Sequence, residues 1–265
     1  MVIETSQRKL YREERKRAIL TYLEEDASVR VSDIAERLDV TQATVRKDIR
    51  ELEAEGLLIR THGGAVRTDS NRLELSVGEA AITAHAEKER IGSAAAQMVS
   101  DGDAIFIQSG TTCLELVRAL GGRRDVTLIT SDLLIAMTAE RVLEDGTVIQ
   151  LGGSLRSGYH YTQGPEAVEQ LLHYHVPKSF LCCNAFSFEQ GFCAHRIEQA
   201  KWVQTLASAS DYRVMLLDSS KIGAGTLVRA IGLEDIDCLI TDTGATDEQR
   251  ARFANVAPDL DVRYV

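Results

Sequence analysis

Hydrophobic residues recur with a helical period in the first quarter of the chain. Val45, Ile49 and Leu52 stand at positions i, i+4 and i+7, which predicts a helix with one buried face. Thr41 before this stretch is a good N-cap, and Gly56 after it suits a helix C-terminus. The pattern therefore predicts one amphipathic helix between these two residues.

Shorter elements flank this helix. Residues 14–23 and 33–38 carry apolar positions at helical spacing, and Ser32 is placed to cap the second of these predicted helices. Residues 57–61 have the composition of a strand and lead into the turn 62–64. Together these elements predict a small unit of three helices and a β wing.

From about residue 80 onward, short apolar runs alternate with longer amphipathic stretches. This βαβα order is typical of an α/β domain with a largely parallel sheet and helices on both of its faces. The predicted strands are residues 104–107, 126–130, 147–151, 179–183, 213–217, 238–241 and 261–265.

The two patterns divide the chain into domains, so the predicted fold class is multi-domain. Residues 1–67 are expected to form a mostly α winged helix-turn-helix domain, with residues 1–12 as an N-terminal extension. Residues 80–265 are expected to form the α/β domain. Residues 68–79 are polar and lack periodicity, which predicts a linker.

Composition and charge narrow the range of functions. The chain has 265 residues, of which 44% are hydrophobic, enough to build packed cores in two domains. A formal net charge of −10 would argue against nucleic-acid binding if the charge were spread evenly. Residues 1–67, however, hold thirteen basic and thirteen acidic residues, so the whole acidic excess lies after Arg67.

The five cysteines and six histidines show no C-x-x-C pair and no metal-ligand spacing. Reduced, buried thiols are therefore expected, and no metal or cofactor is predicted. The chain has no apolar run of membrane-spanning length and begins with polar residues. This predicts a cytoplasmic protein that has no membrane partner.

The polar face of the predicted helix carries a small residue near its N-terminus and three cations. Small and polar side chains at a helix start can approach base edges, and Arg or Lys contact phosphates or guanine. An ordinary solvated basic face has the same periodicity, so the pattern alone leaves both interpretations open. The candidate DNA-binding residues are Thr41, Gln42, Ala43, Thr44, Arg46, Lys47, Arg50, His62 and Gly63.

Several loops that follow predicted strands carry polar side chains. In a parallel sheet such loops meet at the carboxyl edge, where ligands bind. Residues 109–112 (SGTT) combine hydroxyls with free N–H groups at a helix start, an arrangement that favours phosphate. Residues 131–132 are either a helix cap or part of this site, and Lys221 either neutralises an anion or lies in solvent.

Residues 31–65 carry a specific motif. They read VSDIAERLDVTQATVRKDIRELEAEGLLIRTHGGA, with a T-[hydrophobic]-R-[K/R]-D core at residues 44–48 and a terminal HGGA. This stretch closely resembles the helix-turn-helix of the DeoR family of bacterial transcription regulators. The resemblance implies that the first domain binds DNA.

The second domain carries further motifs. They are SGTT at 109–112, the T-[S/N] pair after VTLI, LGG at 151–153, Gly164-Pro165, Asn184, E-x-x-K at 198–201 and DSSK-x-G ending at Gly223. These motifs resemble the C-terminal sensor domain of the DeoR family, and the two resemblances together cover about residues 14–265.

That sensor domain is similar in fold to ribose-5-phosphate isomerase, in which comparable loops hold a phosphosugar. The resemblance therefore implies that this domain senses a phosphorylated or other anionic sugar. The effector-binding residues that it implies are Gln108, Ser109, Gly110, Thr111, Thr112, Ser131, Asp132, Gly152, Gly153, Asn184, Arg196, Glu198, Lys201 and Lys221.

Three places depart from the family pattern. Gln108 stands where an acid is common, residues 159–161 (YHY) where small and aliphatic residues are usual, and residues 193–196 (CAHR) where a Thr-rich loop is usual. His195 and Arg196 add hydrogen-bond donors for an anion. The tyrosines of residues 159–161 either contact the ligand or pack a subunit interface.

The chain is therefore predicted to be a DNA-binding transcriptional regulator, a repressor of a carbohydrate-utilisation operon rather than an enzyme. Its predicted partners are double-stranded operator DNA, an anionic sugar or sugar phosphate, and further copies of the chain in a dimer or tetramer. Glu198, Lys201 and Lys221 beside a phosphosugar would also suit acid–base chemistry. Two alternatives stay open: a sugar-phosphate isomerase with an accessory DNA-binding module, and a ligand-independent DNA-binding protein.

Overall fold

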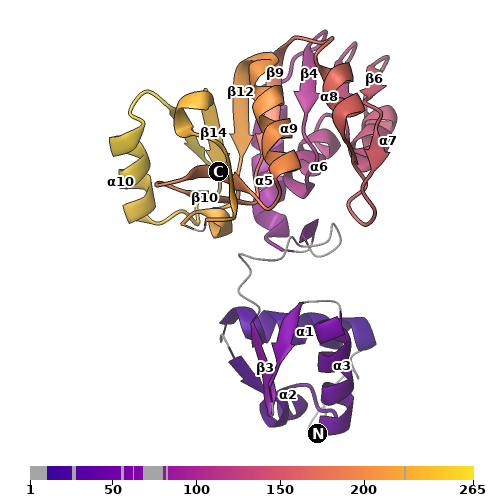
Figure 1. Cartoon of the computed structure of the whole chain (residues 1–265), viewed down its shortest axis with the longest axis vertical. Helices are drawn as coiled ribbons and strands as arrows, with labels where there is room; N and C mark the ends of the chain where they lie inside the picture. Colours follow the sequence, from indigo (N-terminus) through magenta and orange to yellow (C-terminus); the bar gives the residue numbers. More distant parts are fainter. Residues whose placement is uncertain are drawn as a thin grey trace, which may run out of the picture. The chain divides into compact units, whose positions relative to one another are not determined.

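The computed structural model describes residues 11–265 apart from 26–27, 55–56, 62, 68–79, 82 and 224. It divides into two compact units, Met1–Leu73 and Glu74–Val265, which are drawn in Figure 1. The predictions for the N-terminal extension, Gly56, His62 and the linker 68–79 lie wholly or partly outside the described residues.

The N-terminal unit is a winged helix-turn-helix. Its helices are α1 (Arg12–Glu25), α2 (Val31–Arg37) and α3 (Gln42–Ala54), and its strands are β1 (Ser28–Arg30), β2 (Leu58–Arg60) and β3 (Gly64–Arg67). The strands pair antiparallel in the order β1-β3-β2. The fold class predicted for this unit is confirmed.

One apolar core holds the three helices together. Val45, Ile49 and Leu52 of α3 are each at most 1% exposed, as their spacing predicts. Ile19 and Leu23 of α1 belong to the same core, as do apolar residues of α2. Burial of each such side chain contributes about 1.5–3 kcal/mol, so this packing fixes α3 against the rest of the unit.

Two details differ from the sequence-based expectation. Helix α2 begins two residues earlier than predicted, so Ser32 lies inside its first turn and donates to Asp33 (2.7 Å) instead of capping the helix. The Val31 N–H is satisfied by the Gly63 carbonyl (2.9 Å), a contact between residues far apart in sequence. The hydrophobic pattern also does not predict β1, because three residues are too few to show alternation.

The C-terminal unit is built on a seven-stranded sheet. Its order is β15-β14-β12-β9-β4-β5-β6, and every neighbouring pair is parallel. The parallel α/β sheet predicted from the alternating pattern is therefore confirmed. The strands are β4 (Ala104–Ile107), β5 (Thr127–Thr130), β6 (Thr147–Gln150), β9 (Val176–Cys182), β12 (Ser210–Leu216), β14 (Cys238–Thr241) and β15 (Asp261–Tyr264).

Helices cover both faces of this sheet (Figure 1). Buried residues of α5, α6 and α7 form the core on one face, and those of α8, α9 and α10 form the core on the other. The helices are α5 (His85–Ala96), α6 (Thr111–Arg118), α7 (Leu133–Val142), α8 (Pro165–Leu171), α9 (Ile197–Ser208) and α10 (Asp247–Val256).

Helices α5 and α6 lie in backbone contact. A Cβ added at Gly92 of α5 would come within 2.6 Å of the Glu115 backbone in α6, so the two helices can approach this closely only because residue 92 is glycine. Lys88 precedes Gly92 by one helical turn, and Thr111 precedes Glu115 by one turn. This contact therefore fixes the spacing of the two helix segments that carry Lys88 and Thr111.

Two small antiparallel elements lie outside the predicted pattern. β10 (Ala185–Ser187), β11 (Gly191–Ala194) and β13 (Val228–Ile231) form a three-stranded sheet, and β7 (Ser154–Leu155) pairs with β8 (Thr162–Gln163). These strands have four residues or fewer, and β11 pairs with β13 across α9 and β12 in the chain. The described chain also has two 3-10 turns, η1 (Ser219–Lys221) and η2 (Leu233–Asp235).

The cysteines are all buried with free thiols, as the sequence predicts. Within the described ranges, no three His, Cys, Asp or Glu side chains are grouped as ligands for a metal ion. In the same part of the chain, every helix is too short or too polar to cross a bilayer.

Candidate functional site

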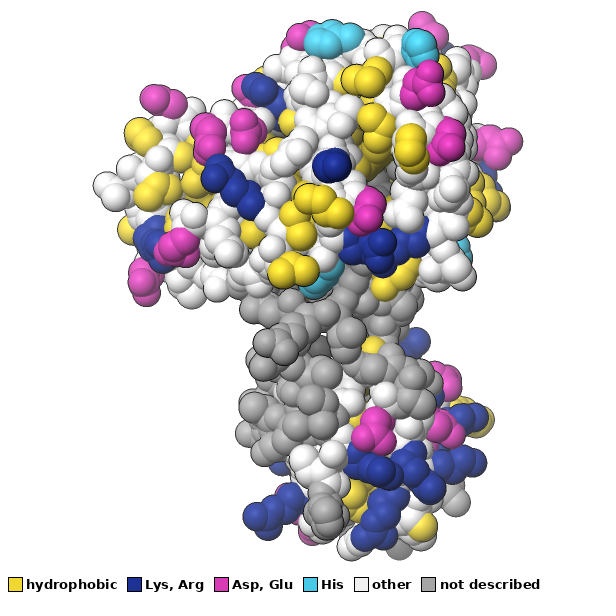
Figure 2. Space-filling view, in the orientation of Figure 1, with side chains coloured by type: hydrophobic (Ala, Val, Ile, Leu, Met, Phe, Trp, Pro, Cys, Tyr) yellow, Lys and Arg dark blue, Asp and Glu magenta, His cyan; other side chains and the backbone are white. Residues whose placement is uncertain are grey.

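The outer face of α3 presents polar and cationic side chains. Thr41 caps the helix by accepting a hydrogen bond from the Thr44 N–H (3.2 Å), and Thr44 itself is half-buried. Figure 2 shows Lys and Arg side chains gathered on the N-terminal unit. The exposed residues on this face of α3 are Gln42, Ala43, Arg46, Lys47 and Arg50.

The cations on this face are not neutralised within the described part of the chain. Arg46 donates to the Gln42 side-chain oxygen (3.1 Å), and Arg50 donates to the Arg46 carbonyl (3.2 Å). The ion pairs of this unit join other residues and leave Arg46, Lys47 and Arg50 without a carboxylate partner among the described residues. Exposed cations of this kind suit the phosphates of DNA.

Behind this face, ion pairs tie α1 to α3. Asp48, only 1% exposed, accepts two hydrogen bonds from Arg15 (2.8 and 3.1 Å). Glu51 accepts one from Arg12 (2.9 Å), which lowers the pKa of its carboxyl group, and lies 3.4 Å from Lys16. These contacts fix the rotation of α3 about its own axis, and with it the direction of its cations.

The turn between β2 and β3 follows α3 in the chain. Gly63 is exposed in this turn, and its carbonyl holds the first turn of α2. His62, the other DNA-binding residue predicted here, lies outside the described residues. DNA contact by the wing therefore stays a prediction.

The predicted effector residues follow strands of the parallel sheet. Residues 109–112 follow β4, residues 131–132 follow β5, residues 152–153 follow β6, Asn184 follows β9 and Lys221 follows β12. Because the sheet order contains the run β12-β9-β4-β5-β6, the carboxyl ends that carry these five turns are neighbours.

The turn 109–112 opens the N-terminus of α6. Gly110 has a φ of 151°, and a Cβ there would come within 2.5 Å of Cys182 Sγ, so this position requires glycine. The Cys182 thiol also donates to the Ser109 carbonyl (3.0 Å). No described side chain caps α6, which leaves the N–H groups of its first turn available at the positive end of the helix. A helix start of this kind favours an anion.

Two buried hydroxyls lie in the turns beside this helix start. Thr112 and Ser131 are 1% and 0% exposed, and neither hydroxyl has a hydrogen-bond partner among the described residues. An unbonded buried hydroxyl costs roughly 1–3 kcal/mol, which a ligand that carries oxygen atoms would offset. Thr111 is half-buried, and its hydroxyl donates to the Ala80 carbonyl over 3.4 Å.

Asp132 caps α7, which confirms the interpretation of residues 131–132 as a helix cap. Its carboxylate accepts hydrogen bonds from the Leu134 and Ile135 N–H groups (2.8 and 3.1 Å). Burial raises the pKa of Asp132, although these hydrogen bonds act in the opposite direction. The hairpin β7–β8 closes over the same turn, because Thr162 donates its N–H to the Ser131 carbonyl (2.9 Å).

Lys221 and Asp218 form an ion pair after β12, in which Lys221 is half-buried. Lys221 Nζ lies 3.3 Å from the carboxylate of Asp218, which is only 1% exposed. Burial opposes the charge of Lys221, but the attraction of Asp218 outweighs it and the pKa of Lys221 is raised. Burial likewise opposes the charge of Asp218, and Lys221 nevertheless lowers the pKa of Asp218. Both groups are therefore charged at neutral pH.

Lys88 is a second cation near Asp218 and is buried, unlike Lys221, and it is absent from the effector residues predicted from the sequence. It is 2% exposed on α5, and its ammonium donates to the Ala80 and Thr83 carbonyls (2.5 and 2.8 Å). Burial, together with the charge of Lys221, lowers the pKa of Lys88 to about 8, against the attraction of Asp218. Lys88, Lys221 and Asp218 thus form one interacting group, which we call the lysine cluster.

The candidate residues predicted from the sequence include neither Asp48, which positions α3, nor Lys88, which belongs to the lysine cluster. Each stands on an apolar stripe of its helix, Asp48 three residues after Val45 and Lys88 three residues before Ile91. A charged residue at a position that periodicity assigns to the core requires a buried partner or a ligand. That conflict between charge and position is the signal that identifies both residues.

Gln108, Gly152 and Gly153 lie at the edge of the site. The Gln108 side-chain oxygen accepts a hydrogen bond from the Cys182 N–H (3.1 Å) and so ties β4 to β9. The Gly152 N–H donates to the Gln170 side-chain oxygen (2.8 Å), and Gly153 leads directly into β7. Their hydrogen bonds stabilise the strand ends, and direct contact with an effector stays a prediction for these three residues.

No hydrogen bond or ion pair of the described residues joins Asn184, Arg196, Glu198 or Lys201 to the lysine cluster. Asn184 is half-buried in the turn between β9 and β10. The other three are exposed around the start of α9, where Arg196 pairs with Glu198 (3.3 Å). Their effector contacts also stay predictions.

The tyrosines of residues 159–161 lie on the hairpin between β7 and β8. The Arg156 guanidinium is 3.7 Å from the Tyr159 ring centroid and donates to the Tyr161 hydroxyl (2.5 Å). Tyr161 also forms a β-bridge with Asp132, so this aromatic group borders the predicted site. Its part in ligand binding or in a subunit interface stays a prediction.

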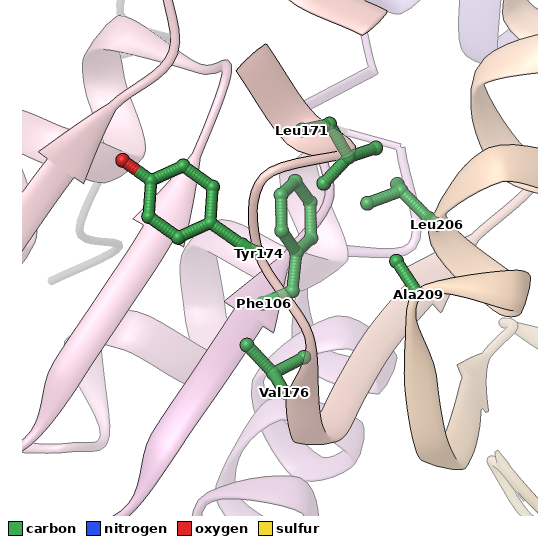
Figure 3. A pocket seen from close by; sticks show the side chains of 6 residues that line it. All are labelled: Phe106, Leu171, Tyr174, Val176, Leu206 and Ala209. Carbon is green, nitrogen blue, oxygen red and sulfur yellow. The ribbon is translucent and has the colours of Figure 1, made fainter. Parts of the chain in front are cut away.

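An apolar crevice lies elsewhere in this unit (Figure 3). It has essentially no space for even a water molecule, and the Tyr174 hydroxyl points away from it. Nothing in its lining would orient an anionic sugar. The lining residues are Phe106, Leu171, Tyr174, Val176, Leu206 and Ala209.

Two family models match the chain. The DeoR-like helix-turn-helix domain matches residues 15–71, and the DeoR C terminal sensor domain matches residues 83–243. The chain is 33% identical to the HTH-type transcriptional regulator YulB of Bacillus subtilis, over 87% of this chain and 89% of that protein.

Two relatives of similar extent are named as repressors. The HTH-type transcriptional repressor GlcR of Bacillus subtilis is 30% identical over 88% of this chain and 89% of its own length. The transcriptional repressor AccR of Agrobacterium fabrum is 28% identical over 88% of this chain and 90% of its own length. Among solved structures, ribose 5 phosphate isomerase A from Neisseria gonorrhoeae has a TM-score of 0.38 and 16% identity, over 52% of this chain and 53% of that chain.

Proposed function

This chain belongs to the DeoR family of transcriptional regulators, and we propose that it represses a carbohydrate-utilisation operon until a phosphorylated or other anionic sugar releases it from the operator. The observation that carries the effector part of this proposal is the lysine cluster beside the start of α6. The proposal assigns operator binding to residues 1–67 and effector sensing and oligomerisation to residues 80–265.

The charge of this group favours an anion. Lys88 and Lys221 bring two positive charges and Asp218 brings one negative charge, so the cluster carries one positive charge in excess. The open N–H groups of α6 and the unbonded hydroxyls of Thr112 and Ser131 lie in the neighbouring turns. A phosphate group accepts hydrogen bonds from all three kinds of donor, and those from the ammonium groups are charge-assisted.

The outer face of α3 supports the DNA-binding part. Its cations have no internal carboxylate partners among the described residues, and the relatives GlcR and AccR are named as repressors. One short helix reads few base pairs, so we propose a two-fold symmetric dimer, alone or within a tetramer. Its operator would then carry two half-sites about one helical turn, or a multiple of it, apart.

The test begins with the full chain and a panel of phosphosugars in a thermal-shift assay. A ligand that binds only the folded protein raises its apparent stability, by about 2.7 kcal/mol at a concentration of 100 Kd. The phosphosugar that stabilises most is then titrated into a complex with operator DNA by fluorescence anisotropy. We expect it to weaken operator binding by roughly 5–150-fold.

Matched variants locate the site. Lys221→Ala should abolish most of the stabilisation, whereas Lys201→Ala, which removes an exposed lysine outside the lysine cluster, should have a smaller effect. Equal losses in both variants would move the site away from the cluster. Conversion of the bound phosphosugar into its isomer would instead show an enzyme, and operator affinity that no ligand changes would show a ligand-independent DNA-binding protein.

A further inference from the structure

The residues that enter the effector domain are held by the proposed effector site itself. Lys88 Nζ donates to the Ala80 carbonyl (2.5 Å) and to the Thr83 carbonyl (2.8 Å), and the Thr111 hydroxyl donates to the same Ala80 carbonyl (3.4 Å). We call Ala80, Thr83 and Ala84 the strap. In the sequence the strap comes directly after residues 68–79, which connect it to the DNA-binding unit.

The strap is held in a strained conformation. Ala84, the residue before α5, has φ 50° and ψ 41°, the left-handed region that non-glycine residues rarely adopt. No side chain of the described residues caps α5. The Lys88 N–H donates to the Ala84 carbonyl (3.0 Å), which begins the hydrogen bonding of the helix. A strained backbone persists only while its surroundings hold it, and here Lys88 does so through the carbonyls of Thr83 and Ala84.

An anion at the start of α6 would compete for the same donors. A hydroxyl has one hydrogen to donate, so Thr111 bonds either to the Ala80 carbonyl or to a phosphate oxygen. A hydrogen bond to an ionised oxygen is roughly twice as strong as one to a neutral carbonyl, and the Thr111 contact with Ala80 is already long. The Lys88 ammonium, which interacts with Lys221 and Asp218, is drawn toward the same anion.

We propose that the phosphate of the effector competes with the strap for the Thr111 hydroxyl and draws the Lys88 ammonium away from the strap carbonyls, so that effector binding releases the strap. Release removes the constraint on the chain where it enters the effector domain, and this is how occupancy of the site reaches the DNA-binding unit. The inference rests on the proposed function, because it takes the lysine cluster as the site of the effector. A ligand acts in this way only when it binds the released state more tightly than the held state.

Amide hydrogen exchange on the full chain tests the proposal. Sodium phosphate is the probe, and sodium chloride of equal ionic strength is the control. Phosphate should slow exchange at the amides of residues 110–112, where it accepts their hydrogens. The same phosphate should accelerate exchange at residues 83–88 by roughly twofold to tenfold, because the strap loses hydrogen bonds.

Three outcomes separate the strap from the site. Slower exchange at 110–112 with faster exchange at 83–88 supports the proposal. Slower exchange at 110–112 with unchanged or slower exchange at 83–88 overturns it and leaves the proposed effector site standing. If neither phosphate nor any phosphosugar of the panel changes exchange at 110–112, the result contradicts the proposed effector site and therefore also the strap proposal.

Two variants of adjacent threonines give a second measurement without any ligand. Thr111→Val removes the hydroxyl that contacts the strap and should accelerate exchange at residues 83–88 by about twofold or more. Thr112→Val removes a neighbouring buried hydroxyl that has no bond to the strap, and should leave exchange at residues 83–88 as in the wild type. Equal exchange in the two variants overturns the proposal.

Discussion

The two functional regions of this molecule hold their positive charges in opposite ways. On α3, Arg46 and Arg50 are exposed to water without a carboxylate partner among the described residues, whereas Lys88 is buried and Lys221 is paired with Asp218. An exposed cation keeps its hydration until DNA arrives, and its contact with phosphate weakens as salt rises. A buried cation has already lost its hydration, so it shifts its pKa and depends on its neighbours.

Under the proposed function, this difference would allow one chain to bind two kinds of phosphate. The backbone of DNA is long and regular, and separate hydrated cations on a rigid helix are sufficient to follow it. A single small anion offers few contacts, so the site that binds it gains selectivity from burial and from donors that lack other partners. Substitutions in the two regions should therefore differ in size and in the property that they change.

The largest effect is expected at Asp48. This residue is a buried charge in the unit whose DNA-binding cations are exposed, so it tests the contrast between buried and exposed charges. Asp48→Ala removes the carboxylate that accepts two hydrogen bonds from Arg15, and we expect a loss of about 3–5 kcal/mol in the stability of this unit. Hydrogen exchange of the α3 amides measures this loss in the full chain. Glu53→Ala, which removes an exposed pair with Arg60 (3.4 Å), should cost about 1 kcal/mol at most. Similar stability losses in Asp48→Ala and Glu53→Ala would contradict the proposed difference between the buried and the exposed ion pair.

The next effect concerns the affinity for the effector. Lys88→Met replaces the buried ammonium by an apolar side chain of similar length, and we expect phosphosugar affinity to fall by about 1.5–3 kcal/mol, or roughly 10–150-fold. Isothermal titration calorimetry with the phosphosugar found in the thermal-shift panel measures this change. Arg196→Ala removes an exposed cation paired with Glu198, and should lower the affinity by about fivefold or less. A larger loss in Arg196→Ala would place the anion near α9.

The effect of a substitution on α3 should depend on whether the lost side chain contacts a base or a phosphate. Arg46→Ala or Arg50→Ala should cost about 1–3 kcal/mol if the side chain contacts a base, whereas loss of a phosphate contact lowers the salt slope by about one. Anisotropy titrations of operator DNA at several salt concentrations separate these two cases. If both folded variants keep the wild-type affinity and slope, α3 does not form the DNA interface.

The smallest expected effect is that of pH, which should change effector affinity but leave operator affinity constant. Under the proposed function the anion would bind protonated Lys88, whose pKa is lowered to about 8, so affinity should be present below that pH and be lost above it. From pH 7 to pH 9 the protonated fraction falls about tenfold, and effector affinity should fall with it. Operator binding by the effector-free protein should stay constant, because arginine keeps its charge throughout this range.

The Cys182 thiol needs its own control in this measurement. Its pKa is also lowered, through a hydrogen bond with Cys113, so its titration would add negative charge beside the lysine cluster. Cys182→Ser should keep the pH profile of the wild type if Lys88 is responsible. A profile that becomes flat in this variant would assign the pH dependence to the thiol.

Local periodicity is sufficient for elements whose buried positions repeat regularly within one segment. The spacing of Val45, Ile49 and Leu52 identified the buried face of α3, and short apolar runs identified the strands of the parallel sheet. The prediction of Ser32 as a cap is wrong because α2 begins two residues earlier, at Val31, whose N–H bonds to the Gly63 carbonyl outside the segment. Such a bond leaves no trace in the sequence near it.

The candidate effector site was less predictable, because it is assembled from separate turns. The turn 109–112 and Lys221 follow apolar strands and so could be assigned to the carboxyl edge of the sheet in advance. Lys88 lies in the middle of a helix, where only its place on the apolar stripe distinguishes it from a solvated lysine. The strands β10, β11 and β13 are too short and too distant in the chain for alternation to identify them.

Gly92 has a consequence for the size of the anion that this protein would accept. Because α5 and α6 touch through their backbones at this residue, the separation of the helix turns that carry Lys88 and Thr111 cannot shrink. Nor can it grow without loss of the contact. The two helices therefore keep a fixed separation. Among oxyanions of equal charge, the site would then select by ionic radius rather than by the number of hydrogen bonds that the anion accepts. A methyl group at position 92 would change that separation.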